Sequence, residues 1–218
     1  IKNIESEVVV NQDSSLNITE NIIADCGVAQ KHGIFRVLPT AQYLEGARQE
    51  SPIELLSITD FDNQPYKFSE TRDRFKKTIT WKIGDENVLV SGVNNYRISY
   101  VVRNALRETD NATELYWNLS GNFWDIPIDR YKAMIRFPQG VSEQNSEINI
   151  YSGRYGSDQD FSISRQFTDN ILTVSYDKTL EPGEGITLSS VFPKGIVEPY
   201  RPTFTEKYGH ILYYLIPI

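Results

Sequence analysis

Hydrophobic and polar side chains alternate with a period of two along most of the chain. In residues 4–10 and 16–21, apolar side chains recur at alternate positions, which is the period of a β-strand with one buried face. The five residues between them, 11–15, are all polar, as the residues of a hairpin loop commonly are. The pattern therefore predicts that the chain opens with an antiparallel β-hairpin.

The same period predicts strands along the rest of the chain. They are expected at residues 34–38, 53–59, 78–83, 88–90, 96–103, 114–119, 133–137, 147–151, 161–167, 171–176 and 186–192. Residues 96–103 give the clearest pattern, so we expect that strand to be long and central. Residues 32–59 are the least regular, and outside their two extended segments we expect one long crossing loop. A helical period is discernible only at 200–218.

These elements predict an all-β fold with an antiparallel β-sandwich architecture. We expect two closely packed β lobes, an N-terminal sandwich over residues 1–128 and a smaller immunoglobulin-like sandwich over 129–198. The boundary follows Pro127, which should end strand pairing. Residues 199–218 are expected to form a juxtamembrane segment and the start of a transmembrane helix.

The transmembrane expectation depends on residues 211–218, which are uninterrupted apolar and aromatic. A membrane-spanning helix needs about 20 such residues, so this run fits its first two turns. Tyr213 and Tyr214 would then lie at the membrane interface. A last buried strand is the alternative, and composition does not separate the two.

Charge and cysteine content exclude several classes of function. The net charge is −7, whereas nucleic-acid binding needs clustered Lys and Arg. The densest basic run, Arg72 to Lys77, contains an acid and is typical of a solvated strand edge. A single cysteine excludes an internal disulfide and a cysteine-built zinc site. We therefore expect no nucleic-acid partner, metal or cofactor.

Two acids stand among aromatic residues, as in a sugar-binding site. Glu114 and Asp125 flank Tyr116, Trp117 and Trp124 in sequence, and a glycosidase needs two carboxyls at a fixed separation. The alternative is that both are solvated acids at the start and after the end of one strand. We favour this alternative and assign no catalytic residue.

Six residues are candidates for binding. They are His32, Arg36, Trp117, Asn118, Trp124 and Asp125. His32 and Arg36 flank Gly33 and are able to hold an anionic group; alternatively, Gly33 supplies a positive φ and Arg36 pairs with an acid. For the other four we favour the alternative that they form a buried polar and aromatic element that joins the two lobes.

Several phrases of the sequence form a familiar ordered set. They are Asp13–Glu20, His32–Arg36, Trp81–Gly84, Gly92 with Tyr96–Tyr100, Glu114–Gly121, Trp124–Ile128, Tyr151–Gly153 with Gly156 and Ser157, and Phe192–Gly195. The set resembles the predicted bacterial membrane proteins grouped as domain of unknown function 2207. The resemblance covers nearly the whole chain, and Glu114–Asn118 is its most specific part. Ser14 and Ile150 depart from the residues usual in that family.

The resemblance implies a topology and leaves the mechanism open. Such proteins have a signal peptide, an extracytoplasmic β domain and one or more transmembrane helices, which favours the membrane interpretation of residues 211–218. We therefore expect a membrane-anchored domain that acts as a binding or protein-interaction module at the cell envelope, with an envelope protein or glycan as its partner. The alternatives are a carbohydrate-active enzyme that uses Glu114 and Asp125, and a structural spacer or assembly subunit.

Overall fold

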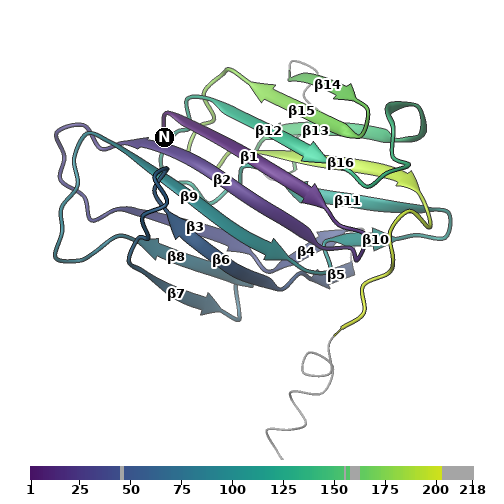
Figure 1. The fold of residues 1–218 in the computed structure, drawn as a ribbon, viewed down its shortest axis with the longest axis horizontal. Coiled ribbons are helices and arrows are strands. Elements are labelled where there is room, and N and C mark those ends of the chain that lie inside the picture. Colours follow the sequence, from purple (N-terminus) through teal and green to yellow (C-terminus); the bar gives the residue numbers. More distant parts are fainter. Residues whose placement is uncertain (45–46, 155, 158–162, 203–218) are drawn as a thin grey trace, which may run out of the picture.

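The computed structural model describes residues 1–44, 47–154, 156–157 and 163–202. Strands make up nearly all of its regular structure, with one short 3-10 helix at Glu143–Asn145. The strands form sheets of seven, four, three and two strands within the described residues (Figure 1). The prediction of an all-β fold is therefore confirmed.

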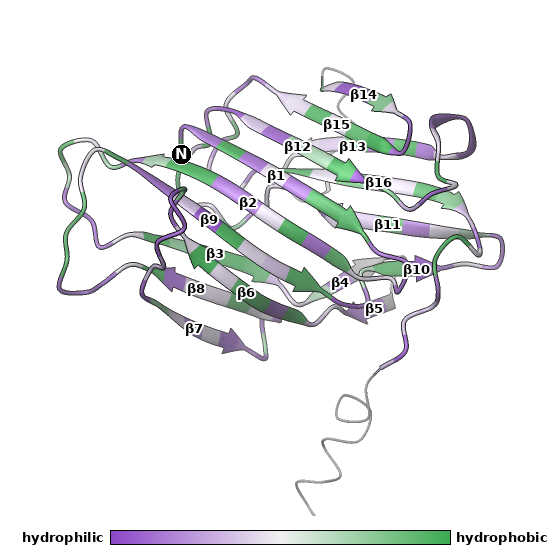
Figure 2. Cartoon of the chain, in the orientation of Figure 1, coloured by the Kyte–Doolittle hydropathy of each residue, from purple (hydrophilic) through white to green (hydrophobic). Residues whose placement is uncertain are grey.

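The largest sheet holds most of the strands that the alternating pattern predicted. Its order is β14 (Ser164–Thr168), β15 (Ile171–Tyr176), β12 (Tyr131–Arg136), β1 (Asn3–Val10), β2 (Leu16–Asp25), β9 (Val93–Val102) and β6 (Ile53–Thr59). β1 and β2 pair antiparallel, which confirms the opening hairpin. β9 is ten residues long and pairs on both sides, as expected of the clearest strand. Figure 2 shows hydrophobic and hydrophilic residues alternating along β1 and β2.

The smaller sheets cover one face of the large sheet. One has the order β10 (Leu106–Glu108), β11 (Ala112–Asn118), β16 (Gly185–Pro193) and β13 (Glu147–Gly153). Another has the order β3 (Ile34–Pro39), β8 (Thr78–Ile83) and β7 (Phe68–Asp73), and β4 (Ala41–Leu44) pairs with β5 (Ala47–Glu50).

Aromatic pairs mark where the layers meet. The rings of Phe137, which follows β12, and Phe192 of β16 are 6.0 Å apart between centroids. Trp81 of β8 and Tyr100 of β9 are 5.4 Å apart. The buried apolar residues of the described chain form one core cluster, so the sandwich has one continuous interior.

The sheets continue across the boundary that we predicted between residues 128 and 129. β12 pairs with β1 in parallel, with Ile4 opposite Tyr131, and β16 pairs with β11. Residues 129–198 therefore contribute to two sheets that they share with residues 1–128, and the immunoglobulin-like lobe is not confirmed. Sequence spacing predicted strands there but carried no information about their partners.

The irregular stretch between residues 32 and 59 is more ordered than we expected. β3 and β6 are the two predicted extended segments, but β4 and β5 form a hairpin where we predicted a loop. Conversely, residues 88–90 are not a strand, because only Val90 forms an isolated bridge, with Lys31. β7 was missed because its residues are exposed or half-buried and show no alternation.

The last described residues cross the turn of the opening hairpin. The Glu198 amide donates to the Gln12 carbonyl at 2.6 Å, and the Ser14 hydroxyl donates to the Glu198 carbonyl at 2.5 Å. Among the described residues, no helix is long and apolar enough to span a membrane. The predicted start of a transmembrane helix at 211–218 lies outside them.

Candidate functional site

A buried ion pair joins the large sheet to the three-stranded sheet. Arg36 of β3 donates from Nε and Nη2 to the two carboxylate oxygens of Glu20 on β2, at 2.7 and 2.5 Å. The Tyr100 hydroxyl on β9 donates to the same carboxylate at 2.8 Å. Both charged side chains are 1% exposed, so every strong contact of Arg36 is inside the protein. Its predicted pairing with an acid is confirmed.

The surroundings of Arg36 fix it further. Its guanidinium carbon lies 5.3 Å from the centroid of the Trp124 ring, whose Nε1 donates to the Ser120 carbonyl at 2.9 Å. Burial alone would lower the pKa of Arg36, but attraction to and hydrogen bonding with Glu20 outweigh it and raise the pKa above its ordinary value. Arg36 stays charged and already paired, so it is not available to hold an external anion.

His32 lies apart from this network, on the surface. Its Nδ1 is 3.3 Å from the Val88 carbonyl oxygen. Next to it, Gly33 has a φ of +133°, and a Cβ there would collide with the Ile83 carbonyl. The positive φ that we predicted for Gly33 is confirmed, and the structure does not bring His32 and Arg36 together at one site.

The other four candidates divide between core and surface. Trp117 and Trp124 are buried, and Asn118 is half-buried and accepts the Gly121 amide on its Oδ1 at 2.8 Å. Asp125 is exposed, so it lies outside the buried element that we predicted. Glu114 is held by Arg107 at 2.6 Å.

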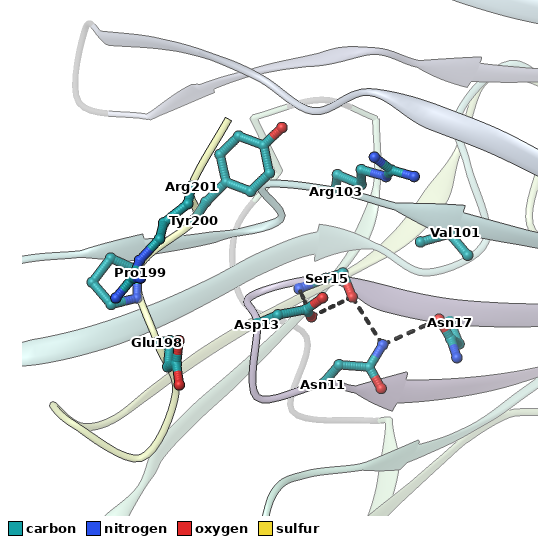
Figure 3. Close-up of a pocket in the computed structure, with 10 residues that line it drawn as sticks. All are labelled: Asn11, Asp13, Ser15, Asn17, Val101, Arg103, Glu198, Pro199, Tyr200 and Arg201. Atoms are coloured by element: carbon teal, nitrogen blue, oxygen red, sulfur yellow. Dashed lines mark hydrogen bonds between the residues drawn. The ribbon is translucent and has the colours of Figure 1, made fainter. Parts of the chain in front are cut away.

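One cavity lies where the C-terminal segment crosses the opening hairpin (Figure 3). Its polar groups mostly satisfy one another: Asn11 donates to the Ser15 hydroxyl at 2.9 Å and to Asn17 at 3.1 Å, and the Ser15 hydroxyl donates to Asp13 at 2.6 Å. Arg103, which also lines it, is paired with Glu54. Because these polar groups are already paired, we interpret the cavity as the place where the C-terminal segment packs on the hairpin, and not as a ligand site.

A second cavity, of about 250 Å³, adjoins β11 and is largely apolar. Its lining residues are Pro39, Ala41, Gln42, Lys76, Lys77, Tyr116, Trp117, Asn118, Phe123 and Thr187. We call it the apolar cavity. It contains two of the predicted binding residues, Trp117 and Asn118, together with residues from β4 and from the turn after β7.

A third cavity, of about 260 Å³, continues across the sheet from the apolar cavity. It is lined by Tyr116, Asn122, Tyr151, Ser152, Gly153, Arg154, Gly156, Ser157, Gly185 and Thr187, and we call it the polar cavity. Tyr116 and Thr187 line both cavities. The two cavities together form what we call the groove, on β11, β16 and β13. Glu114 and Asp125 line neither cavity.

Gln42 is the unusual residue of the groove. Both its Nε2 and Oε1 are buried and make no hydrogen bond. Each unpaired buried polar group in a native structure requires an explanation. The opposite residue in the β4–β5 hairpin, Gln49, donates to the Asn104 carbonyl at 2.6 Å and the Leu106 carbonyl at 3.2 Å. The hairpin therefore does not leave glutamine amides unpaired as a rule.

The sequence predicted the residues of β11 that line the groove but not the residues opposite them. The aromatic block around Trp117 pointed to β11, whereas Gln42 and Phe123 carried no signal. Lys76 was predicted only as part of a solvated edge. No pattern in the chain links residues 39–42 and 76–77 to β11, because the approach is set by how the sheets pack.

The family model for the N-terminal domain of predicted membrane proteins (DUF2207) matches residues 1–192. The chain belongs to this family. Its DUF2207 membership confirms the resemblance drawn from the sequence, and describes the chain as a domain of a predicted membrane protein.

Among curated proteins, this DUF2207 domain is similar to the uncharacterized protein YciQ of Escherichia coli strain K12. The two are 27% identical over 161 residues, which cover 69% of this chain and 24% of YciQ. The chain thus spans about a quarter of the length of that relative.

Solved structures show where else this arrangement of strands occurs. Native leukotriene A4 hydrolase from Saccharomyces cerevisiae is similar with a TM-score of 0.51 and 10% identity, over 87% of this chain and 28% of the hydrolase. The yeast enzyme in complex with bestatin gives a TM-score of 0.51 and 12% identity, over 87% and 28%. At such identities the likeness is one of fold alone.

The DUF2207 phrases of the sequence meet around the buried ion pair. Glu20, Arg36 and Tyr100 belong to three of them, and Trp124 belongs to a fourth. Much of what makes the sequence familiar therefore builds the interior. The Glu114–Asn118 block contributes in addition to the groove, through Tyr116, Trp117 and Asn118.

Proposed function

We propose that this domain is a binding module, held on the extracytoplasmic side of a membrane, whose ligand lies in the groove. The observation that carries the proposal is the Gln42 carboxamide, buried without a partner beside an apolar cavity. A buried amide without hydrogen bonds lowers stability by about 1–3 kcal/mol. Departures of this kind from a fully satisfied interior are expected at functional sites.

The charges around the groove favour an anionic ligand. The chain has a net charge of −7, yet the described residues that line its groove include Lys76, Lys77 and Arg154 and no carboxylate. Lys77 lies 3.2 Å from Glu50, whereas Lys76 forms no ion pair with a described residue. A ligand that joins an apolar group to an anionic group suits these surroundings.

The other functional expectations from the sequence concern the placement of the domain and a catalytic role for Glu114 and Asp125. The extracytoplasmic placement is the one that the family resemblance implies, and an envelope component is then the natural ligand. Glu114 and Asp125 lie outside the groove, and Glu114 is bound to Arg107. No observation therefore favours the carbohydrate-active enzyme over the binding module.

Indole-3-acetate, an aromatic carboxylate, tests the site. Titrated into the isotope-labelled protein, it should shift the amide resonances of residues that line the groove, and neutral indole-3-acetamide should bind more weakly. Phe123, which is 46% exposed, lines the apolar cavity, so Phe123→Ala should weaken binding about fivefold or more through the lost ring contact.

Phe35→Ala is the matched control, because Phe35 is 57% exposed and lies on β3, outside the groove. It should leave the titration unchanged. Resonance shifts that gather at the C-terminal crossing cavity, or equal effects of the two alanine variants, would show that the groove is not the binding site.

A further inference from the structure

We infer that the ligand of the groove is an extended peptide segment that carries an apolar side chain close to an acidic one. This inference rests on the proposed function and narrows it to a substrate class. It follows from the size of the two cavities, the hydrogen-bonding chemistry of Gln42 and the position of Lys76.

The division of the groove into two small cavities suits neighbouring units of a chain. They hold about 250 and 260 Å³, whereas small-molecule sites typically measure about 300–1,000 Å³. Each cavity therefore suits a side chain, and two adjoining cavities suit neighbouring units of one polymer. Successive pockets on a sheet are a common way for proteins to read the side chains of an extended peptide.

The lining of the apolar cavity favours a peptide over a glycan. Five of its residues present apolar surface, Pro39, Ala41, Tyr116, Trp117 and Phe123. A sugar ring would bring hydroxyl groups on most of its carbons into a cavity whose uncharged polar side chains, apart from the Tyr116 hydroxyl, are Gln42, Asn118 and Thr187. An apolar amino-acid side chain makes no such demand.

Gln42 supplies the match to a peptide group. A carboxamide has one carbonyl acceptor and two N–H donors, so it can pair reciprocally with the N–H and C=O of a peptide bond. In the free protein both polar ends of Gln42 are unpaired. Turning the amide into the cavity that its own side chain lines therefore breaks no hydrogen bond and gains two.

Lys76 supplies the match to an acidic side chain. It is exposed, it lines the same cavity as Gln42, and it forms no ion pair with a described residue. Alternate side chains of an extended peptide point to the same face. An acidic residue two positions from the apolar residue can therefore reach Lys76 while the apolar side chain fills the cavity.

Capped tripeptides containing phenylalanine, glycine and aspartate, with an asparagine twin as the neutral control, test the inference by calorimetric titration. Gln42→Met should weaken binding of the aspartate peptide about tenfold, the loss expected for two hydrogen bonds. The same variant should raise the melting temperature by about 2–4 °C, because an unsatisfied buried amide is removed. Lys76→Gln should abolish the preference for aspartate over asparagine.

Two matched variants serve as controls. Gln49→Met removes an amide that is hydrogen-bonded in the opposite strand, so it should lower the melting temperature. Lys82→Gln neutralises an exposed lysine on β8, outside the groove, and should keep the aspartate preference.

The outcomes separate this inference from the proposed function. If indole-3-acetate binds in the groove but the peptides do not, or bind Gln42→Met and wild type equally, the peptide assignment is wrong and the binding site stands. Binding of a soluble chitin oligosaccharide in place of the peptides would likewise overturn the peptide assignment. If neither probe binds in the groove, both proposals fall.

Discussion

Arg36 and Gln42 are polar residues six positions apart, and both have buried polar atoms. The polar atoms of Arg36 are paired within the protein, whereas those of Gln42 are not. Arg36 meets a carboxylate at 2.7 and 2.5 Å and an aromatic ring at 5.3 Å. Gln42 meets no partner at either end of its amide. The strand β3 carries Arg36 into the centre of the sandwich, whereas β4 carries Gln42 to the edge of a cavity.

This difference shows how residues that stabilise the fold can be distinguished from residues that bind a ligand in this family. A buried charge that is fully paired and hydrogen-bonded fixes the arrangement of the sheets around it, and removing one partner is costly. A buried amide that is left unpaired lowers stability in the free protein, so a ligand that pairs with it recovers that loss. The familiar residues of the interior are therefore a poor guide to the ligand site.

The largest effect on the paired interior should come from high pH. Burial raises the pKa of Tyr100 and Tyr131 above the ordinary 10.0. Above about pH 10 the unfolded chain loses these two protons and the folded chain keeps them, so these two groups lower stability by about 3 kcal/mol per pH unit. Denaturant unfolding at about pH 9 and about pH 12 measures this loss, which reaches about 5 kcal/mol over that range.

Tyr131→Phe sharpens the alkaline prediction. The Tyr131 hydroxyl is buried beside Ser6 without a hydrogen bond of ordinary geometry, so its removal should be tolerated near neutral pH while the loss of stability per pH unit becomes smaller. Tyrosinate absorbance from Tyr100 that grows before the protein unfolds would contradict the burial of these hydroxyls.

Breaking the ion pair should have the next largest effect. Arg36→Met leaves the Glu20 carboxylate buried with the Tyr100 hydroxyl as its remaining hydrogen-bond donor among the described residues, which should lower the free energy of unfolding by about 3–5 kcal/mol. The double variant Glu20→Leu with Arg36→Met removes both charges and should recover much of the loss. Equal stability of the single and double variants would show that the charges are not coupled.

The smallest of these effects concerns the space around Arg36. Gly121 has a φ of +81°, and a Cβ there would collide with Arg36 Nη1, which Glu20 and burial prevent from moving aside. Gly183 has a φ of +83° and open space around it. Gly121→Ala should therefore cost about 1–3 kcal/mol more than Gly183→Ala in thermal or chemical unfolding. A smaller difference would mean that the Arg36 side chain moves aside to make room for the added Cβ.

Sequence patterns predicted the parts of the fold in which burial alternates. β1, β2 and β9 bury every second side chain, and all three were predicted. β7 buries none of its residues completely, and β4 and β5 have four residues each, too few to display a period. These three strands were missed for that physical reason.

The site was predicted only where one segment carried it alone. The aromatic residues around Trp117 and Asn118 indicated this segment in the sequence, and both residues line the groove. The partner of Arg36 was predicted as an acid but not identified, because Glu20 lies on another sheet. Gln42 and Lys76 gain their meaning from packing between distant segments, which no local pattern encodes.

The parallel pairing of β1 with β12 has a consequence for biosynthesis. One edge of β1 has no partner until residues 131–136 have left the ribosome, because β12 completes the ladder from Ile4 to Val9. Contacts between such distant segments form slowly, and an unpaired strand edge recruits other chains. Nascent chains halted between the end of β11 and the start of β12 should consequently depend on chaperones more than chains that extend past Arg136.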